Sequence, residues 1–417
     1  MAKIVLSTIG SLGDLHPKLA LGIELRRRGH HVVINSWEGY AEKVAMLGLD
    51  FAPLRPSHDP FDRELMREAM DAWKGPETII RRMLFPYLRE MYEDVIAACE
   101  GADILVSGEI VFVARSVMEK TGIKWISTSL APFSMFSSHD PNVFPTAEWM
   151  DVFRPLPTGF HRGLFGLMRL TIRHWYEPYK EFRRELGLDP APDPVFEGKY
   201  SDRLHLAMFS KVLMKPQPDW FSPTMQTGFC FYDGEQDLGQ MQPALEDFLA
   251  SGKPPIVFTL GSAAVMDPRD FFDESIKAAK LLRRRAVLAY GIFNEPPKGL
   301  TDDIVGFEYV PYSRLFPRAA CVVHQGGVGT TAHVLRAGVP HLIMPYSHDQ
   351  PDNAARCRRL GVAEVISRGR YKAETAASAI SRILDSLSYA AIAKRAAAII
   401  ATEDGIKSAC DAIEAQL

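Results

Sequence analysis

The sequence predicts an α/β protein made of two doubly wound domains, each built on a parallel sheet. An apolar segment that ends in Gly-Ser occurs twice, at 3–9 and at 255–260, and a helical pattern follows each copy. Apolar segments and helical patterns then alternate in both halves, which is typical of parallel sheets with crossover helices. A chain of 417 residues with 47% hydrophobic residues is long enough for two such domains. We therefore expect two Rossmann-like domains.

The first half begins with the expected strand at 3–9, followed by a crossover helix at 18–28. Pro17 suits the first turn of that helix and Gly29 its end. Apolar segments that continue the sheet lie at 31–35, 103–107 and 124–129.

The second half repeats this scheme after the strand at 255–260. A helix is expected at 269–284, and the strands and helices expected to follow lie at 286–290, 305–309, 321–324, 328–337, 341–344, 373–384 and 389–401. A polar stretch between Phe231 and Pro255, broken by glycines and prolines, predicts the boundary. The expected domains are residues 1–232 and 255–387, joined by a linker at 233–254.

Composition excludes several classes of protein. A net charge of -3 and a pI near 6.5 give no reason to expect a nucleic-acid partner. The five cysteines are widely spaced and odd in number, which predicts reduced thiols in a cytoplasmic protein. The amino terminus enters a strand directly and no long apolar run occurs, so we expect neither a signal peptide nor a spanning helix.

The segment at 322–351 has the layout of a binding site for a phosphate group. An apolar run ends in His324, and the glycines that follow allow the backbone to approach a ligand closely. The helix expected at 328–337 would point its free N–H groups at that ligand, and helix amino termini attract anions. A second apolar run precedes Ser347, His348, Asp349 and Gln350. One ligand with a phosphate end and a hydroxyl-rich end would satisfy both clusters, because ligands bind at the carboxyl ends of parallel strands.

The motifs His-x-Gly-Gly-x-Gly-Thr-Thr, Arg-Ala-Gly-Val-Pro and His-Asp-Gln-Pro-Asp-Asn-Ala follow one another here. Together they resemble the donor-binding signature of the UDP-glycosyltransferase family (glycosyltransferase family 1). Within that family they are most similar to the bacterial rhamnosyltransferases and the sterol or macrolide glucosyltransferases. The resemblance implies the GT-B fold, in which two Rossmann-like domains face a cleft. It also implies that the carboxyl-terminal helix, within 388–417, crosses back onto the first domain.

The resemblance further implies an inverting glycosyltransferase that needs no metal and no cofactor. Its donor would be a UDP- or dTDP-sugar carrying a hexose, glucose or rhamnose, and its acceptor a hydroxyl of a lipophilic small molecule such as a flavonoid, sterol, polyketide or glycolipid. A nucleotide-sugar-binding protein or epimerase without transfer is an alternative. A dinucleotide-dependent oxidoreductase is a third class. Such enzymes need Gly-x-Gly-x-x-Gly after the first strand and an acidic residue at the end of the second, where this chain has Gly-Ser-Leu-Gly-Asp and Asn35.

Asp14 and His16, in the loop after the first strand, are the candidate catalytic residues. Transfer to a hydroxyl needs a base that removes its proton, and a carboxylate or an imidazole can do this. The Gly-Asp-x-x-Pro pattern resembles the sterol, macrolide and rhamnosyl branches, which favours Asp14 as the base. Alternatively, Asp14 only caps the helix that starts near Pro17.

Candidate donor-binding residues lie in the second half. His324 is expected to donate to a pyrophosphate oxygen, although a histidine at a strand end is also a common core residue. Ser262 resembles a family serine that reaches the phosphates and could equally be a turn serine. The amides expected to complete the phosphate cradle, with the Thr330 hydroxyl, belong to Gly327, Val328, Gly329 and Thr330.

Asp349 and Gln350 resemble the acid-amide pair that holds the donor sugar, although Asp349 could also cap a helix ahead of Pro351. Tyr309 stands where plant relatives have a tryptophan that stacks on uracil; it could stack likewise or be a core aromatic.

The acceptor side is less distinctive. Segments 56–98 and 132–157 are rich in apolar residues that could line a pocket or serve in packing. Segment 161–184 mixes basic and aromatic residues and could contact a membrane surface, or be a solvated helix face.

Overall fold

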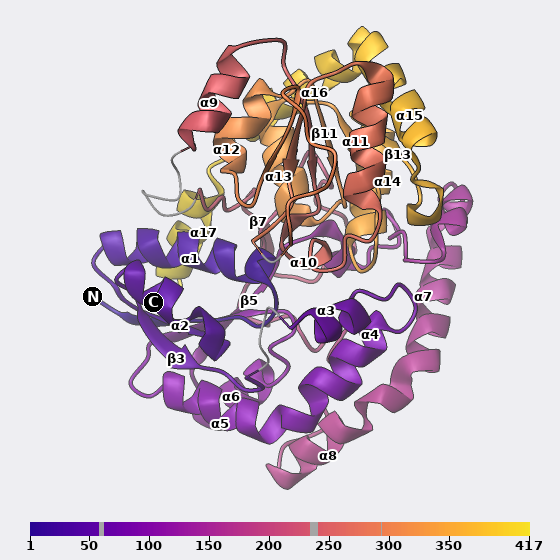
Figure 1. Cartoon of the computed structure of the whole chain (residues 1–417). Coiled ribbons are helices and arrows are strands. Elements are labelled where there is room, and N and C mark those ends of the chain that lie inside the picture. Colours follow the sequence, from indigo (N-terminus) through magenta and orange to yellow (C-terminus); the bar gives the residue numbers. More distant parts are fainter. Residues whose placement is uncertain (58–61, 234–240, 293) are drawn as a thin grey trace.

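The computed structural model describes residues 1–57, 62–233, 241–292 and 294–417, arranged as two α/β domains (Figure 1). The sheet of the first domain has the order β3-β2-β1-β4-β5-β6-β7 and that of the second β10-β9-β8-β11-β12-β13. All of these pairings are parallel. Both sheets thus contain the Rossmann strand order 3-2-1-4-5-6, which confirms the predicted α/β architecture.

The strands of the first domain are β1 (Lys3–Ser7), β2 (His31–Ser36), β3 (Asp50–Pro53), β4 (Ile104–Gly108), β5 (Lys124–Ser129), β6 (His205–Ala207) and β7 (Thr224–Gln226). Its helices are α1 (Leu12–Arg27), α2 (Ala41–Met46), α3 (Arg63–Ala69), α4 (Gly75–Glu77), α5 (Leu88–Ala98), α6 (Ala114–Thr121), α7 (Thr158–Ile172) and α8 (Glu177–Glu185).

The strands of the second domain are β8 (Ile256–Thr259), β9 (Ala286–Ala289), β10 (Ile304–Phe307), β11 (Cys321–His324), β12 (His341–Ile343) and β13 (Ala363–Val365). Its helices are α9 (Pro243–Ala250), α10 (Gly261–Ala264), α11 (Phe271–Leu282), α12 (Tyr312–Leu315), α13 (Val328–Ala337), α14 (Gln350–Leu360), α15 (Ala373–Asp385) and α16 (Leu387–Ile400), and α17 (Gly405–Glu414) follows them. None of the helices described is long and apolar enough to cross a membrane.

Helix α1 starts at Leu12, six residues earlier than the sequence suggested. Ser11 accepts a hydrogen bond from the Gly13 N–H, and the Asp14 side chain accepts one from the Ser11 N–H, so the two residues form a capping box. These bonds satisfy free donors of the first turn and allow the helix to begin before Pro17. Asp14 therefore lies in the first turn of α1 rather than in a loop ahead of it.

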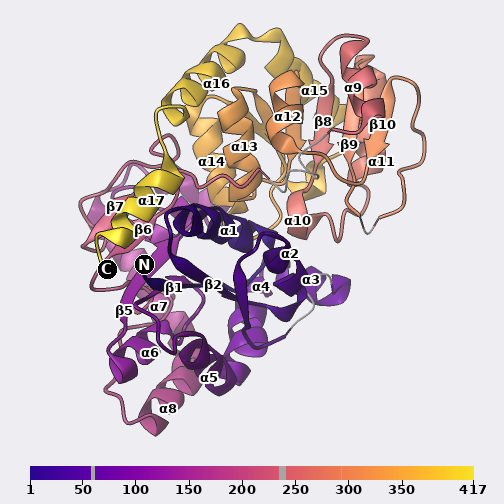
Figure 2. The ribbon, with the colours of Figure 1, turned by 90° about the vertical axis from the view of Figure 1, so that its left-hand side faces the viewer.

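The expected crossing of 388–417 is correct only for its last part. Helix α16 packs against α13 and stays with the second domain, whereas α17 packs against α1 of the first domain (Figure 2). Arg28 pairs with Asp411 at 2.7 Å and with Glu414 at 2.6 Å, which fixes α17 beside the end of α1.

The predicted linker at 233–254 also needs adjustment. Residues 234–240 lie outside the described residues, but α9 is part of the second domain, because Leu245 and Phe248 are buried together with Val257 of β8. The second domain thus begins ahead of Pro255.

Candidate active site

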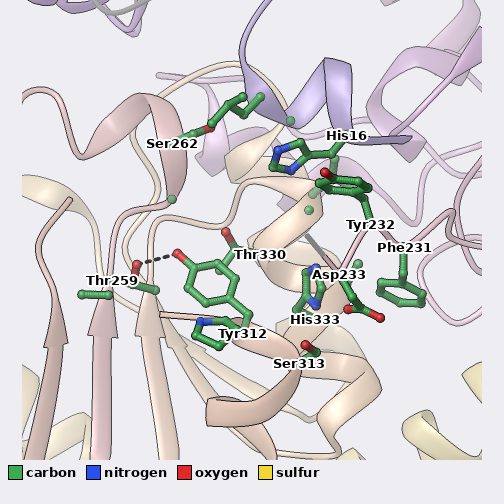
Figure 3. A pocket seen from close by; sticks show the side chains of 18 of the residues that line it. His16, Phe231, Tyr232, Asp233, Thr259, Ser262, Tyr312, Ser313, Thr330 and His333 are labelled. Carbon is green, nitrogen blue, oxygen red and sulfur yellow. Dashed lines mark hydrogen bonds between the residues drawn. The ribbon is translucent and has the colours of Figure 1, made fainter. Parts of the chain in front are cut away.

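A cavity of about 300 Å³ lies between the two domains (Figure 3). Ligands of doubly wound sheets bind where the strand order reverses, which here is after β1 and β4 and after β8 and β11. The start of α1 contacts α10, so these two reversal points face each other. The residues that line the cavity include Gly13 and His16 of α1, Tyr232 and Asp233 of the connection, and Ser262, Tyr309, Val328, Gly329 and Thr330 of the second domain.

Asp14 is held against the loop that ends β1. Its carboxylate accepts a hydrogen bond from the Ser11 N–H at 2.9 Å. Gly10, with a φ of +125°, makes room for it, since a Cβ atom there would lie 2.3 Å from Asp14 Oδ2. The Tyr40 hydroxyl donates to the Gly10 carbonyl at 3.0 Å and supports this turn.

The electrostatic surroundings of Asp14 suit a base that works near neutral pH. Burial, together with the smaller effects of the Glu109 and Asp349 carboxylates, raises the pKa of Asp14 from 3.8 to about 7 against the opposing Ser11 hydrogen bonds. Glu109 follows β4 of the same domain, whereas Asp349 belongs to the second domain. The fold therefore brings the predicted base and the predicted sugar-binding acid to one place.

Lys18 lies one helical turn after Asp14 and escaped the sequence analysis. Its buried ammonium donates to the Thr128 hydroxyl at 2.6 Å. Burial lowers the pKa of Lys18 to about 7, while Cys230 and Asp14 oppose this. A lysine in the middle of an apolar helical pattern was the available signal, because a buried lysine needs a polar partner.

His16 lines the cavity but is a poor base. Its ring lies 4.8 Å from the ring of Tyr232, centroid to centroid. Burial lowers the pKa of His16 to about 3. The imidazole is therefore neutral at physiological pH and holds an added proton weakly, which favours Asp14.

His324 is engaged inside the second domain. Its Nδ1 accepts from the Gly326 N–H at 3.0 Å, so its Nε2 carries the proton that is donated to His341 Nδ1 at 2.8 Å. Burial lowers the pKa of His324 well below its usual value. Both ring nitrogens are thus occupied, and a phosphate oxygen would have to displace one of these bonds.

The side chain of Gln325, the next residue, points toward Gly261 and Gly327. A Cβ atom on Gly261 would lie 2.3 Å from Gln325 Nε2, and one on Gly327 would lie 2.8 Å from it. The Gln325 amide therefore lies between the loop after β8 and the start of α13. Its Oε1 is buried and has no hydrogen-bond partner among the described residues. Since side chains alternate along a strand, the burial of His324 should have directed attention to its neighbour.

The predicted phosphate cradle forms the amino terminus of α13. Gly327 is the N-cap, and Val328, Gly329 and Thr330 form the first turn, where backbone N–H groups are free of helical partners. Asp349 also lies near this terminus, where the Val328 N–H slightly favours the charged form of its carboxylate.

Asp349 and Gln350 are partly committed to their own loop. Burial raises the pKa of Asp349 to about 6, and Asn353 Nδ2 donates to the carboxylate at 2.7 Å. Gln350 Oε1 accepts from the Tyr346 N–H at 2.9 Å. The Gln350 NH₂ group remains the part that can donate to a ligand.

The remaining donor candidates lie at the cavity wall. Ser262 is exposed at the start of α10, across from His16 (Figure 3). Tyr309 is 45% exposed, so it is not a core aromatic. Tyr312 stands farther in, where its hydroxyl bonds the Thr259 hydroxyl at 2.7 Å.

Two segments of the first domain contact the second domain near Ser347 and Arg356. Ser347 Oγ donates to the Asp71 carbonyl at 3.2 Å. Farther along, Arg356 pairs with both Asp352 at 2.7 Å and Asp140 at 2.5 Å in a buried network. The predicted acceptor segment 132–157 therefore serves partly in interdomain packing. In the other one, 56–98, residues 58–61 lie outside the described residues.

Comparisons with known proteins identify the family of this chain. The family model "Glycosyltransferase family 28 N-terminal domain" matches residues 4–129, and "Erythromycin biosynthesis protein CIII-like, C-terminal domain" matches residues 295–407. The O-mycaminosyltylonolide 6-deoxyallosyltransferase of Streptomyces fradiae is 32% identical over 99% of this chain and 97% of its own. The chain belongs to the UDP-glycosyltransferase family.

Further members of this family show the same breadth of similarity. The vancomycin aglycone glucosyltransferase of Amycolatopsis orientalis is 29% identical over 86% of this chain and 84% of its own. The crystal structure of the kitacinnamycin glycosyltransferase superimposes with a TM-score of 0.70 at 20% identity, covering 100% of this chain and 99% of that one, which confirms the GT-B fold. The protein is a nucleotide-sugar-dependent glycosyltransferase.

Proposed function

We propose that this glycosyltransferase moves a hexose, glucose or rhamnose, from a UDP- or dTDP-sugar to a hydroxyl of a lipophilic small molecule, with inversion and without a metal. The observation that carries the proposal is the electrostatic interaction between Asp14 of the first domain and Asp349 of the second, whose charge helps to raise the pKa of Asp14. One group belongs to the predicted proton acceptor and the other to the predicted sugar site.

In this mechanism the Asp14 carboxylate accepts the proton of the acceptor hydroxyl while the oxygen of that hydroxyl attacks the anomeric carbon. The bond from that carbon to the diphosphate oxygen breaks, and the nucleoside diphosphate leaves with the electron pair. A single displacement from the opposite face inverts the anomeric centre.

The leaving diphosphate needs stabilisation of its negative charge. The free N–H groups at the start of α13 and the Gln325 amide supply donors, and the helix dipole favours an anion there. We assign this role to Gln325 in place of His324, whose two nitrogens are occupied. Ser262 is positioned at the cavity wall to add a hydroxyl donor.

The sugar and base contacts follow from the same geometry. Asp349 and the Gln350 NH₂ group would bind sugar hydroxyls, and the exposed ring of Tyr309 would stack on uracil or thymine. A small-molecule acceptor is favoured because the S. fradiae relative is named for O-mycaminosyltylonolide and the A. orientalis relative for the vancomycin aglycone.

The test is incubation of the protein with UDP-glucose or dTDP-rhamnose and a panel of phenols, sterols and macrolide aglycones. We expect a mass increase of one hexosyl residue on an acceptor, with nucleotide release that depends on that acceptor. Acceptor-independent turnover of the sugar nucleotide would instead support an epimerase or hydrolase.

A further inference from the structure

Helix α7 runs along the outer edge of the first domain (Figure 1) and carries an exposed apolar stripe. Leu167 and Leu170 are 58% and 56% exposed, and Phe160 is 43% exposed. Their spacing of seven and three residues puts them on one face of the helix. Further exposed apolar residues precede α7 in the chain, namely Trp149, Val152 and Leu156.

The opposite face of α7 is held by the fold. Phe165 is buried and packs edge-on against Phe136, with ring centroids 6.1 Å apart. His161 is buried one turn earlier. The helix is thus fixed in place by one face. On the outer stripe, Phe160 contacts the Phe153 ring with centroids 5.8 Å apart, whereas Leu167 and Leu170 stay more than half exposed.

A basic stripe runs beside the apolar one. Arg162, Arg169 and Arg173 are seven and four residues apart, so they share a neighbouring face. Between 152 and 176 the sequence contains no aspartate or glutamate. Arg169 pairs with Glu197, whereas Arg162 and Arg173 form no ion pair within the described ranges. Glu177, one turn after Arg173, interacts with it electrostatically, so the surface joins exposed apolar side chains to positive charge that acidic residues offset only in part.

We propose that the apolar and basic stripes of α7 dock the enzyme on the surface of an anionic lipid bilayer. Leucine and phenylalanine side chains would enter the acyl boundary, while the arginines bind lipid phosphates, as in helices that lie in the membrane interface. The whole chain carries a net charge of -3, so this attraction is local to α7 and sets the orientation of the protein.

A second copy of the chain is a poorer occupant of this surface. A two-fold contact would place α7 against α7, and the like charges of Arg162 and Arg173 would then face one another. A bilayer also suits the shape, since a protruding helix can enter a lipid surface without a complementary groove. The docking does not depend on the proposed acceptor, although lipophilic acceptors would concentrate in the same bilayer.

The experiment is cosedimentation of the full chain with vesicles of phosphatidylcholine alone or mixed equally with phosphatidylglycerol. We expect binding to the anionic vesicles only, weakened by salt. Arg162→Gln with Arg173→Gln should lower the partition coefficient about 30-fold, at about 1 kcal/mol for each charge. Leu167→Gln with Leu170→Gln should lower it at least about tenfold.

Matched controls exist in the second domain. Leu281 on α11 is 59% exposed, so Leu281→Gln removes an equally exposed leucine and should leave binding unchanged. Lys394→Gln with Arg395→Gln on α16 removes two exposed charges and should also have little effect. Circular dichroism should show every variant folded, because all of these side chains lie at the surface.

Equal binding by the α7 variants and the wild type, or equal losses in the controls, would overturn the proposal. So would a concentration-dependent dimer in light scattering that Leu167→Gln with Leu170→Gln abolishes, because it would assign the stripe to a second copy. Transfer to a water-soluble acceptor should be the same in all variants. If the wild type showed no transfer to any acceptor, the proposed function would be contradicted and the docking result would remain.

Discussion

Asp14→Asn should make the protein more stable and less active. Burial raises the pKa of Asp14 from 3.8 to about 7, so the folded state holds a proton there that the unfolded state has released. At 1.36 kcal/mol per pH unit, keeping the carboxylate charged in the fold costs at most about 4 kcal/mol above pH 7. An amide avoids that cost and can still accept the Ser11 hydrogen bond.

The sign of the pH dependence follows from the direction of the shift. The folded pKa lies above the unfolded one, so the wild type incurs no cost below about pH 4 and the full cost only above about pH 7. The stability difference between Asp14→Asn and the wild type should therefore grow from near zero at pH 4 to its maximum at pH 8. Urea denaturation at each pH measures it.

Asp404, the N-cap of α17, supplies a matched control. It is exposed and accepts a hydrogen bond from the Lys407 N–H at 3.0 Å, and asparagine caps helices as well as aspartate does. Asp404→Asn should leave stability nearly unchanged. If Asp14→Asn were instead clearly less stable than the wild type at pH 8, Asp14 would be a helix cap rather than a strained catalytic group.

Three further changes test other parts of the site. The kcat/KM for transfer should fall about tenfold per pH unit below about pH 7 as Asp14 becomes protonated. Lys18→Met should move this acidic limb of the pH profile to higher pH, because it removes a positive charge near Asp14. A profile that Lys18→Met leaves in place would contradict this. Gln325→Ala should weaken UDP or dTDP binding about tenfold or more in titration calorimetry, through loss of a hydrogen bond to a charged group; unaltered affinity would return the phosphate role to other groups. Arg356→Met should lower the free energy of unfolding by about 3–5 kcal/mol, because it leaves the Asp352 carboxylate buried without its partner. The control Arg359→Met on the same helix should lower the free energy of unfolding by about 1 kcal/mol or less.

The sequence contained much of this fold, because its strands are short apolar runs with clear ends. The repeated Gly-Ser after β1 and β8 marked the two halves, and the glycine-rich segment located the start of α13. Strands β3, β6, β7 and β13 were missed. They contain only 3–4 residues each and at most two consecutive apolar residues, so no apolar run marks them.

The parts of the site that escaped prediction depend on side-chain direction and on contacts between distant segments. His324 and Gln325 are adjacent in the motif, and only the pairing of His324 with His341 shows that Gln325 is the one that points toward Gly261 and Gly327. The electrostatic interaction between Asp14 and Asp349 joins residues from different domains, and no local pattern encodes it. Family resemblance, rather than periodicity, implied a cleft between the domains.

The most direct test of the central claim is acceptor-dependent nucleotide release by Asp14→Asn, measured at saturating sugar nucleotide beside the wild type. The two proteins should bind the donor equally, since Asp14 does not line the phosphate cradle, and release by the variant should be about 10²–10⁴-fold slower, as for loss of a general base. Release by Asp14→Asn at the wild-type rate would show that the proton goes elsewhere and that the assignment of the base is wrong.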